Sequence, residues 1–114
     1  MTANDITLRN ASGTYSIRAA GAVLGESSNV IELVEGNAAP VYYVPRSDLA
    51  MALFDKTDTT SHCPKKGEAS YYTLEAKSGP IKDAAWSYET PNAGLEQIAG
   101  HLAFFADKVT VEEV

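Results

Sequence analysis

The chain has 114 residues, of which 45% are hydrophobic and 21% are charged, and its formal net charge is −6. This composition is typical of a soluble globular protein and excludes an extended disordered chain, while the length corresponds to one domain over residues 1–114. Because affinity for phosphate backbones comes from clustered lysine and arginine, the acidic balance argues against nucleic-acid binding and against anionic membrane surfaces.

Cys63 is the only cysteine in the chain. A single cysteine excludes an intramolecular disulfide and every zinc site that is built on paired cysteines. The first residues lack the basic region and apolar stretch of a signal peptide, and no apolar run approaches the ~20 residues that span a bilayer. We therefore expect a cytoplasmic protein without a metal or other cofactor, and without nucleic-acid or membrane partners.

Short strands are predicted in the first part of the chain, where alternating or apolar runs are separated by turn residues at intervals of roughly 8–12 residues. These runs are residues 5–9, 14–19, 22–27, 30–34 and 40–45. The prolines at both ends of the last run indicate a strand that is short or lies at an edge, because proline cannot donate a hydrogen bond to a sheet. The spacing is typical of a small antiparallel sheet, sandwich or barrel.

The middle of the chain predicts a helix followed by a polar loop. Residues 49–54 have the helical pattern, with Ser47 as the N-cap and Asp48 in the first turn. Residues 55–58 are expected to form the loop, which leads into the stretch 59–72.

Strands are predicted again in the last part of the chain. Residues 70–75 and 84–88 have the strand pattern, and residues 91–98 predict a short helix. Residues 100–105 and 108–111 are expected to pair as a closing hairpin. The whole chain is therefore expected to be mainly β with one or two short helices.

Two adjacent lysines in an acidic protein mark the most informative stretch. Pro64-Lys65-Lys66-Gly67 predicts a turn in which the glycine lets backbone N–H groups converge on an anion while the ammonium groups add charge. The hydroxyl of Thr60 adds a donor, so the basic turn 60–67 would hold a phosphate or a carboxylate. The alternative is a solvated turn that carries two ordinary surface lysines.

Arg46 and His101 are further candidates for ligand binding. The guanidinium of Arg46, between a proline-ended strand and a helix start, would bind a carboxylate or phosphate through two parallel hydrogen bonds. The alternative for Arg46 is an ion pair with Asp48 or Glu68 on the surface. The alternative for His101 is a structural histidine whose hydrogen bonds are satisfied within the fold.

Cys63 has two interpretations. A nucleophilic cysteine needs a lowered thiol pKa, for which the neighbouring lysines would supply a positive field. His62 is adjacent, so in an extended segment its ring points away from the thiol, and His101 is the only other imidazole. The alternative is a small apolar residue that seats the turn against a sheet.

Aromatic side chains are the third feature that predicts a binding site. Six tyrosines and one tryptophan on a small β-domain would furnish a stacking pocket with polar tips. Neighbouring residues in a strand point to opposite faces, so one aromatic of each adjacent pair faces the core and the other faces solvent or a cavity. Core filling is the alternative for each of them, including Tyr43, Tyr71, Trp86 and Tyr88.

Several blocks of the sequence resemble a known family. They are Glu26-Ser27, Tyr42-Tyr43-Val44-Pro45-Arg46-Ser47-Asp48, the run from Thr60 to Tyr71 with its Cys-Pro and Lys-Gly pairs, Ala85-Trp86-Ser87-Tyr88-Glu89 and Gly100-His101-Leu102-Ala103-Phe104-Phe105. In this order they are similar to domain of unknown function 427, a bacterial and fungal family, over about residues 20–111. The resemblance implies a single small antiparallel β-barrel or β-tent-like domain, similar to the Mss4-like barrels, with one or two short helices. It implies no reaction.

Three hypotheses about function follow. The first is a domain that binds a small anionic molecule in a pocket lined by tyrosine and tryptophan beside the basic turn. The second is a small enzyme that uses Cys63 or tyrosine and histidine chemistry, and the third is a structural or interaction module that acts as a homodimer. The candidate ligand-binding residues are Tyr43, Arg46, Thr60, Cys63, Lys65, Lys66, Tyr71, Trp86, Tyr88 and His101.

Overall fold

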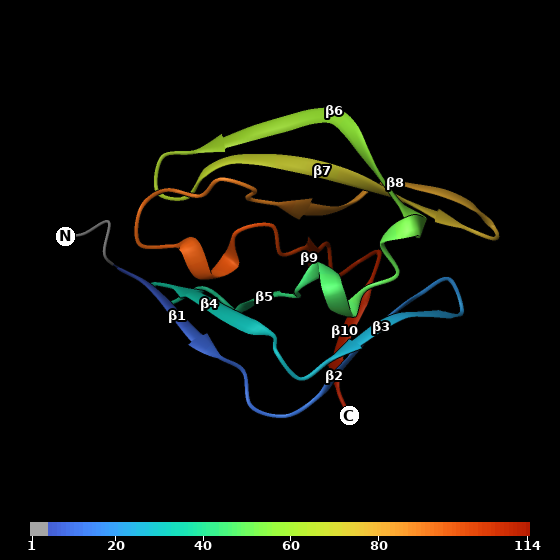
Figure 1. Ribbon diagram of the computed structural model, residues 1–114, viewed down its shortest axis with the longest axis horizontal. Coiled ribbons are helices and arrows are strands. Elements are labelled where there is room, and N and C mark those ends of the chain that lie inside the picture. Colours follow the sequence, from blue (N-terminus) through green and yellow to red (C-terminus); the bar gives the residue numbers. More distant parts are fainter. Residues whose placement is uncertain (1–4) are drawn as a thin grey trace.

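The computed structural model describes residues 5–114, which form three antiparallel sheets in two layers (Figure 1). The upper layer is a four-stranded sheet with the order β6 (Phe54–Cys63), β7 (Gly67–Ala76), β8 (Gly79–Ser87) and β9 (Ala103–Phe104). The lower layer holds two three-stranded sheets. One has the order β1 (Ile6–Asn10), β4 (Ile31–Glu35) and β5 (Val41–Tyr43), and the other has the order β10 (Thr110–Glu113), β2 (Tyr15–Ala19) and β3 (Ala22–Ser27).

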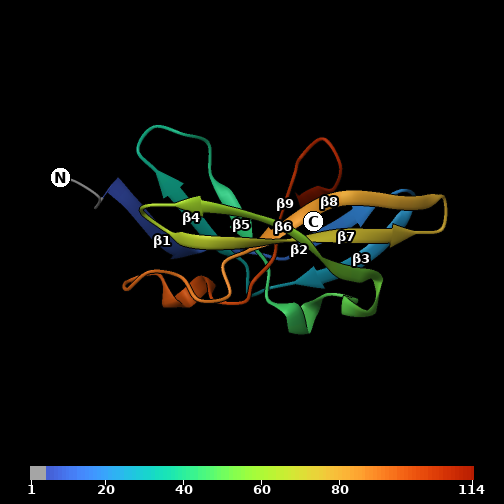
Figure 2. The same cartoon turned by 90° about the horizontal axis from the view of Figure 1, so that it is seen from above.

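The prediction of a mainly β fold is confirmed. Within residues 5–114 the strands belong to separate sheets that do not close into a barrel. An isolated bridge between Val44 and Leu102 joins the residue after β5 to the residue before β9, and one between Gly25 and Leu49 joins β3 to the segment between two 3-10 turns. Figure 2, from above, shows the long strands β6, β7 and β8 running across the strands of the lower layer. Among the described residues, no helix has the length and apolar composition needed to cross a bilayer.

The polar segment 55–58, expected as a loop, is part of strand β6. Its register with β7 shifts between Lys56 and Thr60, so the strand carries a bulge there. Asp83 on β8 holds this bulge, because its carboxylate accepts hydrogen bonds from the hydroxyls of Thr57 and Thr59, both at 2.8 Å. Asp83 has a positive φ of 49°, which aspartate tolerates better than most residues. The polarity of this segment therefore reflects an exposed strand face.

The helix expected over 49–54 is also wrong. This part of the chain contains only two short 3-10 turns, η2 (Arg46–Asp48) and η3 (Met51–Leu53). Pro45 occupies the N-cap position of η2 without a side-chain cap, so Ser47 does not cap a helix. Between the turns, Leu49 bridges to Gly25 and the N–H of Ala50 donates to the carbonyl of Leu24 at 2.8 Å. A longer helix would need the backbone N–H of Ala50 for a hydrogen bond within the helix, but here this group is bonded to β3.

The closing hairpin expected from 100–111 does not form. Strand β9 pairs with β8, with Phe104 opposite Ala85, whereas β10 pairs with β2, with Val111 opposite Ile17. Burial explains the divergence, because Phe104 and Val109 both enter the core. The segment 91–98 contributes only the 3-10 turn η4 (Glu96–Ile98).

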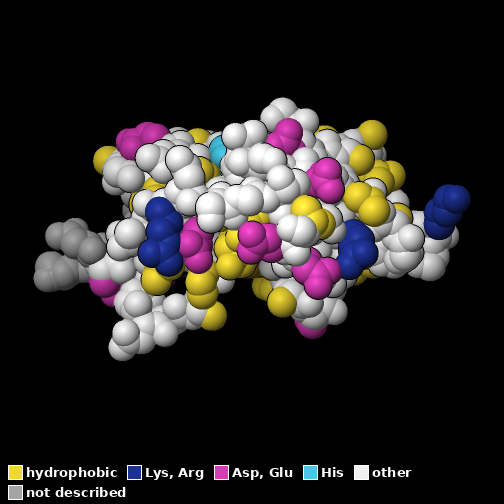
Figure 3. Space-filling view, turned by 90° about the horizontal axis from the view of Figure 1, so that it is seen from below, with side chains coloured by type: hydrophobic (Ala, Val, Ile, Leu, Met, Phe, Trp, Pro, Cys, Tyr) yellow, Lys and Arg dark blue, Asp and Glu magenta, His cyan; other side chains and the backbone are white. Residues whose placement is uncertain are grey.

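Two hydrophobic clusters form the core. The larger includes Ile17, Val44, Leu74 and Leu102, all completely buried. The smaller cluster includes three of the residues that line the cavity described in the next section, Leu33, Tyr43 and Tyr88. Its members are Ile31, Leu33, Tyr43, Ala69, Tyr88, Leu95, Ile98 and Ala103. Figure 3 shows the molecule from below, where carboxylates are scattered among apolar side chains and the basic side chains stand at separate positions.

Candidate ligand-binding site

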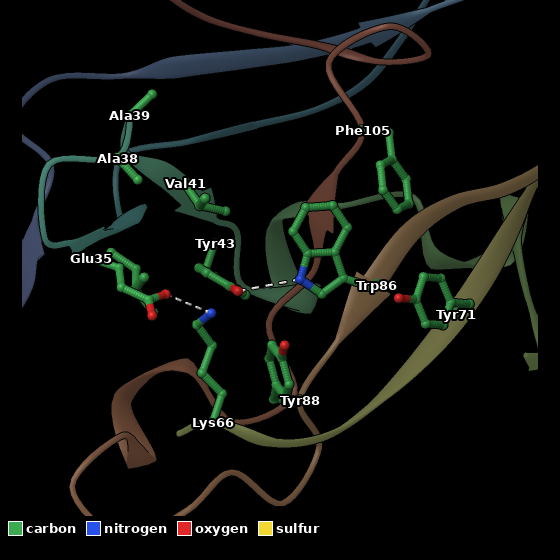
Figure 4. Close-up of a pocket in the computed structure, with 11 residues that line it drawn as sticks. Glu35, Ala38, Ala39, Val41, Tyr43, Lys66, Tyr71, Trp86, Tyr88 and Phe105 are labelled. Carbon is green, nitrogen blue, oxygen red and sulfur yellow. Dashed lines mark hydrogen bonds and ion pairs between the residues drawn. The ribbon is translucent and has the colours of Figure 1, made fainter. Parts of the chain in front are cut away.

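A cavity of about 230 Å³ opens where β4 and β5 of the lower layer face β7 and β8 of the upper layer (Figure 4). Five of its eleven lining residues are aromatic, and one lysine and one glutamate lie at one end. The lining residues are Leu33, Glu35, Ala38, Ala39, Val41, Tyr43, Lys66, Tyr71, Trp86, Tyr88 and Phe105. The cavity therefore lies between segments that are far apart in the sequence.

Three rings form the aromatic end of the cavity. The rings of Trp86 and Phe105 have centroids 4.7 Å apart and are tilted by 54°. Tyr71 stacks beside Phe105 at 6.2 Å with an interplanar angle of only 15°. The hydroxyl of Tyr71 is hydrogen-bonded to that of Ser61 at 2.8 Å, so the polar tip of this ring is already satisfied.

Hydrogen-bond donors gather at the other end. In Figure 4 the Lys66 ammonium and the hydroxyls of Tyr43 and Tyr88 point into the same space beside the indole nitrogen of Trp86. The Tyr43 hydroxyl accepts a hydrogen bond from Trp86 Nε1 at 3.3 Å, so its own proton remains available. Within residues 5–114 the Tyr88 hydroxyl has no hydrogen-bond partner. Lys66 Nζ binds Glu35 Oε1 at 2.9 Å.

Burial and ion pairing determine the protonation states of the titratable side chains at this end of the cavity. Burial raises the pKa of Tyr43 and of Tyr88 above the ordinary value of a phenol, so both hydroxyls stay protonated at neutral pH. Burial alone would lower the pKa of Lys66, but its hydrogen bond to Glu35 raises it above its usual range. The same bond lowers the pKa of Glu35. The end of the cavity thus presents one ammonium group and two neutral phenols as donors.

Half of the predicted site residues meet in this cavity, namely Tyr43, Lys66, Tyr71, Trp86 and Tyr88. Lys66 reaches this cavity because the turn that links β6 to β7 orients the side chains of the two adjacent lysines differently. Lys66 enters the cavity, with its side chain only 17% exposed. Lys65 lies outside the lining and pairs with Asp5 at 3.1 Å and with Glu35 at 3.4 Å.

The other predicted residues lie elsewhere. Thr60 is exposed on β6 opposite Ser70. Cys63 is partly buried against the smaller hydrophobic cluster, and its Sγ lies 3.9 Å from Lys66 Nζ. His101 borders a separate polar hollow of about 470 Å³ that also contains Asn10 and Asn29. Its Nδ1 lies 3.2 Å from the carbonyl oxygen of Ala99.

Sequence reasoning missed six of the lining residues, of which Glu35 and Phe105 carry a charge and a ring; the others are Leu33, Ala38, Ala39 and Val41. Phe105 adjoins Phe104, and the alternation of adjacent residues between the two faces of a strand would have placed one of the two outside the core. Phe104 is indeed buried and Phe105 half-buried. Glu35 carries no such signal, because its role depends on the approach of Lys66 from another sheet.

Arg46 is the centre of a second polar cluster, outside the cavity lining. Its guanidinium donates to the carbonyl of Gly100 at 2.5 Å, to the hydroxyl of Tyr72 at 2.8 Å and to Glu89 at 2.8 Å. Glu89 also accepts hydrogen bonds from Tyr72 and from Lys56. The surface partners expected for Arg46, Asp48 and Glu68, are not the ones that it binds. These contacts tie η2 to β7 and to the segment after β8.

A pH-dependent contribution to stability is expected from Glu89. The hydrogen bond from Tyr72, together with that from Lys56, lowers the pKa of Glu89 below the ordinary 4.5. The unfolded state then binds more protons than the native state, so this contribution is present above about pH 4.5 and is lost as the pH falls through the lower native value. Urea unfolding of wild type and Glu89→Gln between pH 7 and pH 3 should show their difference in stability shrinking at low pH. A constant difference would contradict this role.

Two comparisons with known proteins bear on the chain. The family model described as a domain of unknown function (DUF427) matches residues 7–114, which is nearly the whole chain. No curated protein matches it. Among residues 5–114, no three histidine, cysteine or acidic side chains are grouped so as to hold a metal ion.

Proposed function

The chain belongs to the family described as a domain of unknown function (DUF427), and from this premise we propose that it binds a small anionic molecule in the cavity between its layers. The observation that carries the proposal is the convergence of Lys66, Tyr43 and Tyr88 on one end of an aromatic cavity. Three donors and one positive charge at a partly desolvated position favour an acceptor that carries negative charge.

Glu35 supports this proposal, although it is itself an anion. It uses one of the three ammonium protons of Lys66. It also holds the ammonium group at the end of the cavity, so a ligand would meet a lysine that is already positioned. Lys65 also contacts Glu35, at 3.4 Å, so the negative charge of Glu35 is shared between two ammonium groups.

The size of the cavity limits the ligand. Pockets for drug-sized molecules have volumes of about 300–1,000 Å³, whereas this cavity has about 230 Å³. A monocyclic or bicyclic metabolite fits such a volume, and a nucleotide exceeds it. Of the basic turn 60–67, Lys66 is the residue that lines this cavity.

Replacement of Lys66 tests the proposal. Wild type and Lys66→Met are compared by thermal shift against a panel of small carboxylates, inorganic phosphate and sugar phosphates. Bound ligand stabilises the native state in proportion to the logarithm of its concentration. We expect at least one anion to stabilise wild type, and Lys66→Met to weaken its binding by about tenfold or more through the loss of a charge-assisted hydrogen bond.

Lys65→Met is the matched control, because Lys65 belongs to the same turn but does not line the cavity. It removes the same charge and should change the affinity by less than about threefold, as expected for a partly exposed, screened charge that already pairs with Asp5. Equal losses in the two variants, or the absence of any stabilising anion, would contradict the proposal.

A further inference from the structure

The two ends of the cavity differ enough to indicate the class of ligand. We infer that the anion is the carboxylate of a planar aromatic molecule, whose ring lies against Trp86, Phe105 and Tyr71 while its carboxylate meets Lys66, Tyr43 and Tyr88. This inference rests on the proposed function. It specifies that the uncharged part of the ligand is an aromatic ring.

The wall at the aromatic end suits a flat, apolar ring. Trp86 and Phe105 are tilted by 54°, which leaves ring faces and edges at an angle to one another. Aromatic guests gain from both offset-stacked and edge-to-face contacts, so such a corner favours a third ring over an aliphatic group of equal size. Leu33 and Val41 complete the lining with apolar surface.

Sugars and other polyols match this wall poorly. Each hydroxyl of such a ligand needs a hydrogen-bond partner once it leaves water. The polar tip of Tyr71 is already bonded to Ser61 at 2.8 Å, and Trp86 Nε1 is directed at Tyr43. The remaining donors are those that the carboxylate would use.

Cationic ligands are also disfavoured, although rings of aromatic side chains can hold quaternary ammonium groups. The ammonium of Lys108 already lies over the ring of Phe105, 5.4 Å from its centroid. Lys66 places a second positive charge at the other end. A cation at the Lys66 end of the cavity would meet an ammonium group, whereas a carboxylate would be attracted by it.

Matched small molecules test the inference on the whole protein. Phenylacetate, cyclohexylacetate, 2-phenylacetamide and benzyltrimethylammonium have similar sizes and differ in the ring, in the charge or in its sign. Trp86 is the only tryptophan in the chain, so its fluorescence reports on the cavity itself. We expect phenylacetate to bind about fivefold more tightly than cyclohexylacetate and about tenfold more tightly than the amide.

Each outcome decides between the two proposals. Equal affinity for phenylacetate and cyclohexylacetate would overturn the aromatic class and leave the binding of small anions intact. Tighter binding of benzyltrimethylammonium would overturn both. If phenylacetate does not bind at millimolar concentration while another anion stabilises the protein, the inference fails and the proposed function stands.

A variant of the wall supplies an independent check. Phe105→Leu removes one ring from a half-buried position and leaves the donors in place. It should reduce the ratio between the affinities for phenylacetate and cyclohexylacetate to below about twofold, because the lost contact is specific to aromatic guests. An unchanged ratio would show that the ring does not lie against Phe105 and would overturn the placement. Fluorescence of Trp86 in the absence of ligand confirms that the variant folds.

Discussion

Gly25→Ala is expected to destabilise the protein by about 3 kcal/mol, a large part of the stability of a domain of this size. A Cβ at this position would lie 2.2 Å from the carbonyl oxygen of Asp48 and 3.1 Å from the Cα of Leu49. Both are backbone atoms, so β3 or the segment that joins η2 to η3 would have to move. Such a movement would also strain the hydrogen bond from Ser27 Oγ to Asp48 Oδ2, now 2.6 Å long.

Urea unfolding of Gly25→Ala beside Gly21→Ala measures this effect. Gly21 lies in the turn between β2 and β3 with a positive φ of 76°, and a Cβ there would meet nothing within 4 Å. Its replacement should cost about 1 kcal/mol, from backbone conformation alone. Equal costs at the two positions would show that the close approach of β3 to Asp48 does not constrain the fold.

Arg46→Ala is expected to lower stability by about 2 kcal/mol, because the variant leaves several polar groups without their donor. The carbonyl of Gly100 and the carboxylate of Glu89 would each lose a hydrogen bond from the guanidinium. The ring of Tyr72 would lose the cation 5.1 Å from its centroid. Thermal and urea unfolding give the free energy, and Lys56 remains to hold Glu89.

Arg18→Ala is the matched control for Arg46. Arg18 forms an ion pair with Glu112 at 2.8 Å, and both side chains are more than half exposed, at 52% and 59%. Exposed pairs of this kind contribute less than about 1 kcal/mol. If Arg46→Ala lowered the free energy of unfolding no more than Arg18→Ala does, the polar cluster around Glu89 would not contribute to stability.

Local pattern was enough to predict the fold class and several strands. Alternation in the sequence identified β2, where Tyr15 and Ile17 are buried as predicted; Ser16 between them is buried too, so this strand is covered on both faces there. The same rule failed for 55–58, where a strand with a polar, exposed face looks like a loop. The pairing of strands was harder to predict, because no local pattern indicates that β10 pairs with β2 and that β9 pairs with β8.

The sequence predicted which types of residue form the candidate site, but not which individual residues line it. Tyrosines, Trp86 and the basic turn were predicted to converge, and five of the predicted residues line one cavity. The choice between Lys65 and Lys66 depends on how the turn between β6 and β7 is oriented, which adjacency in sequence does not determine. Arg46 was predicted to bind a ligand from its position alone, whereas the partner it meets, Glu89, comes from a distant segment.

The pairing of β2 with β10 has a consequence for how the chain folds during synthesis. Arg18 and Glu112, which form an ion pair across these strands, are 94 residues apart in the sequence. A ribosome adds residues at about 5–20 per second, so β2 waits for several seconds before its second neighbour exists. During that time its outer edge offers unpaired backbone groups to other chains. Strand β10, which is made long after β2, therefore closes an edge that is open to aggregation until then.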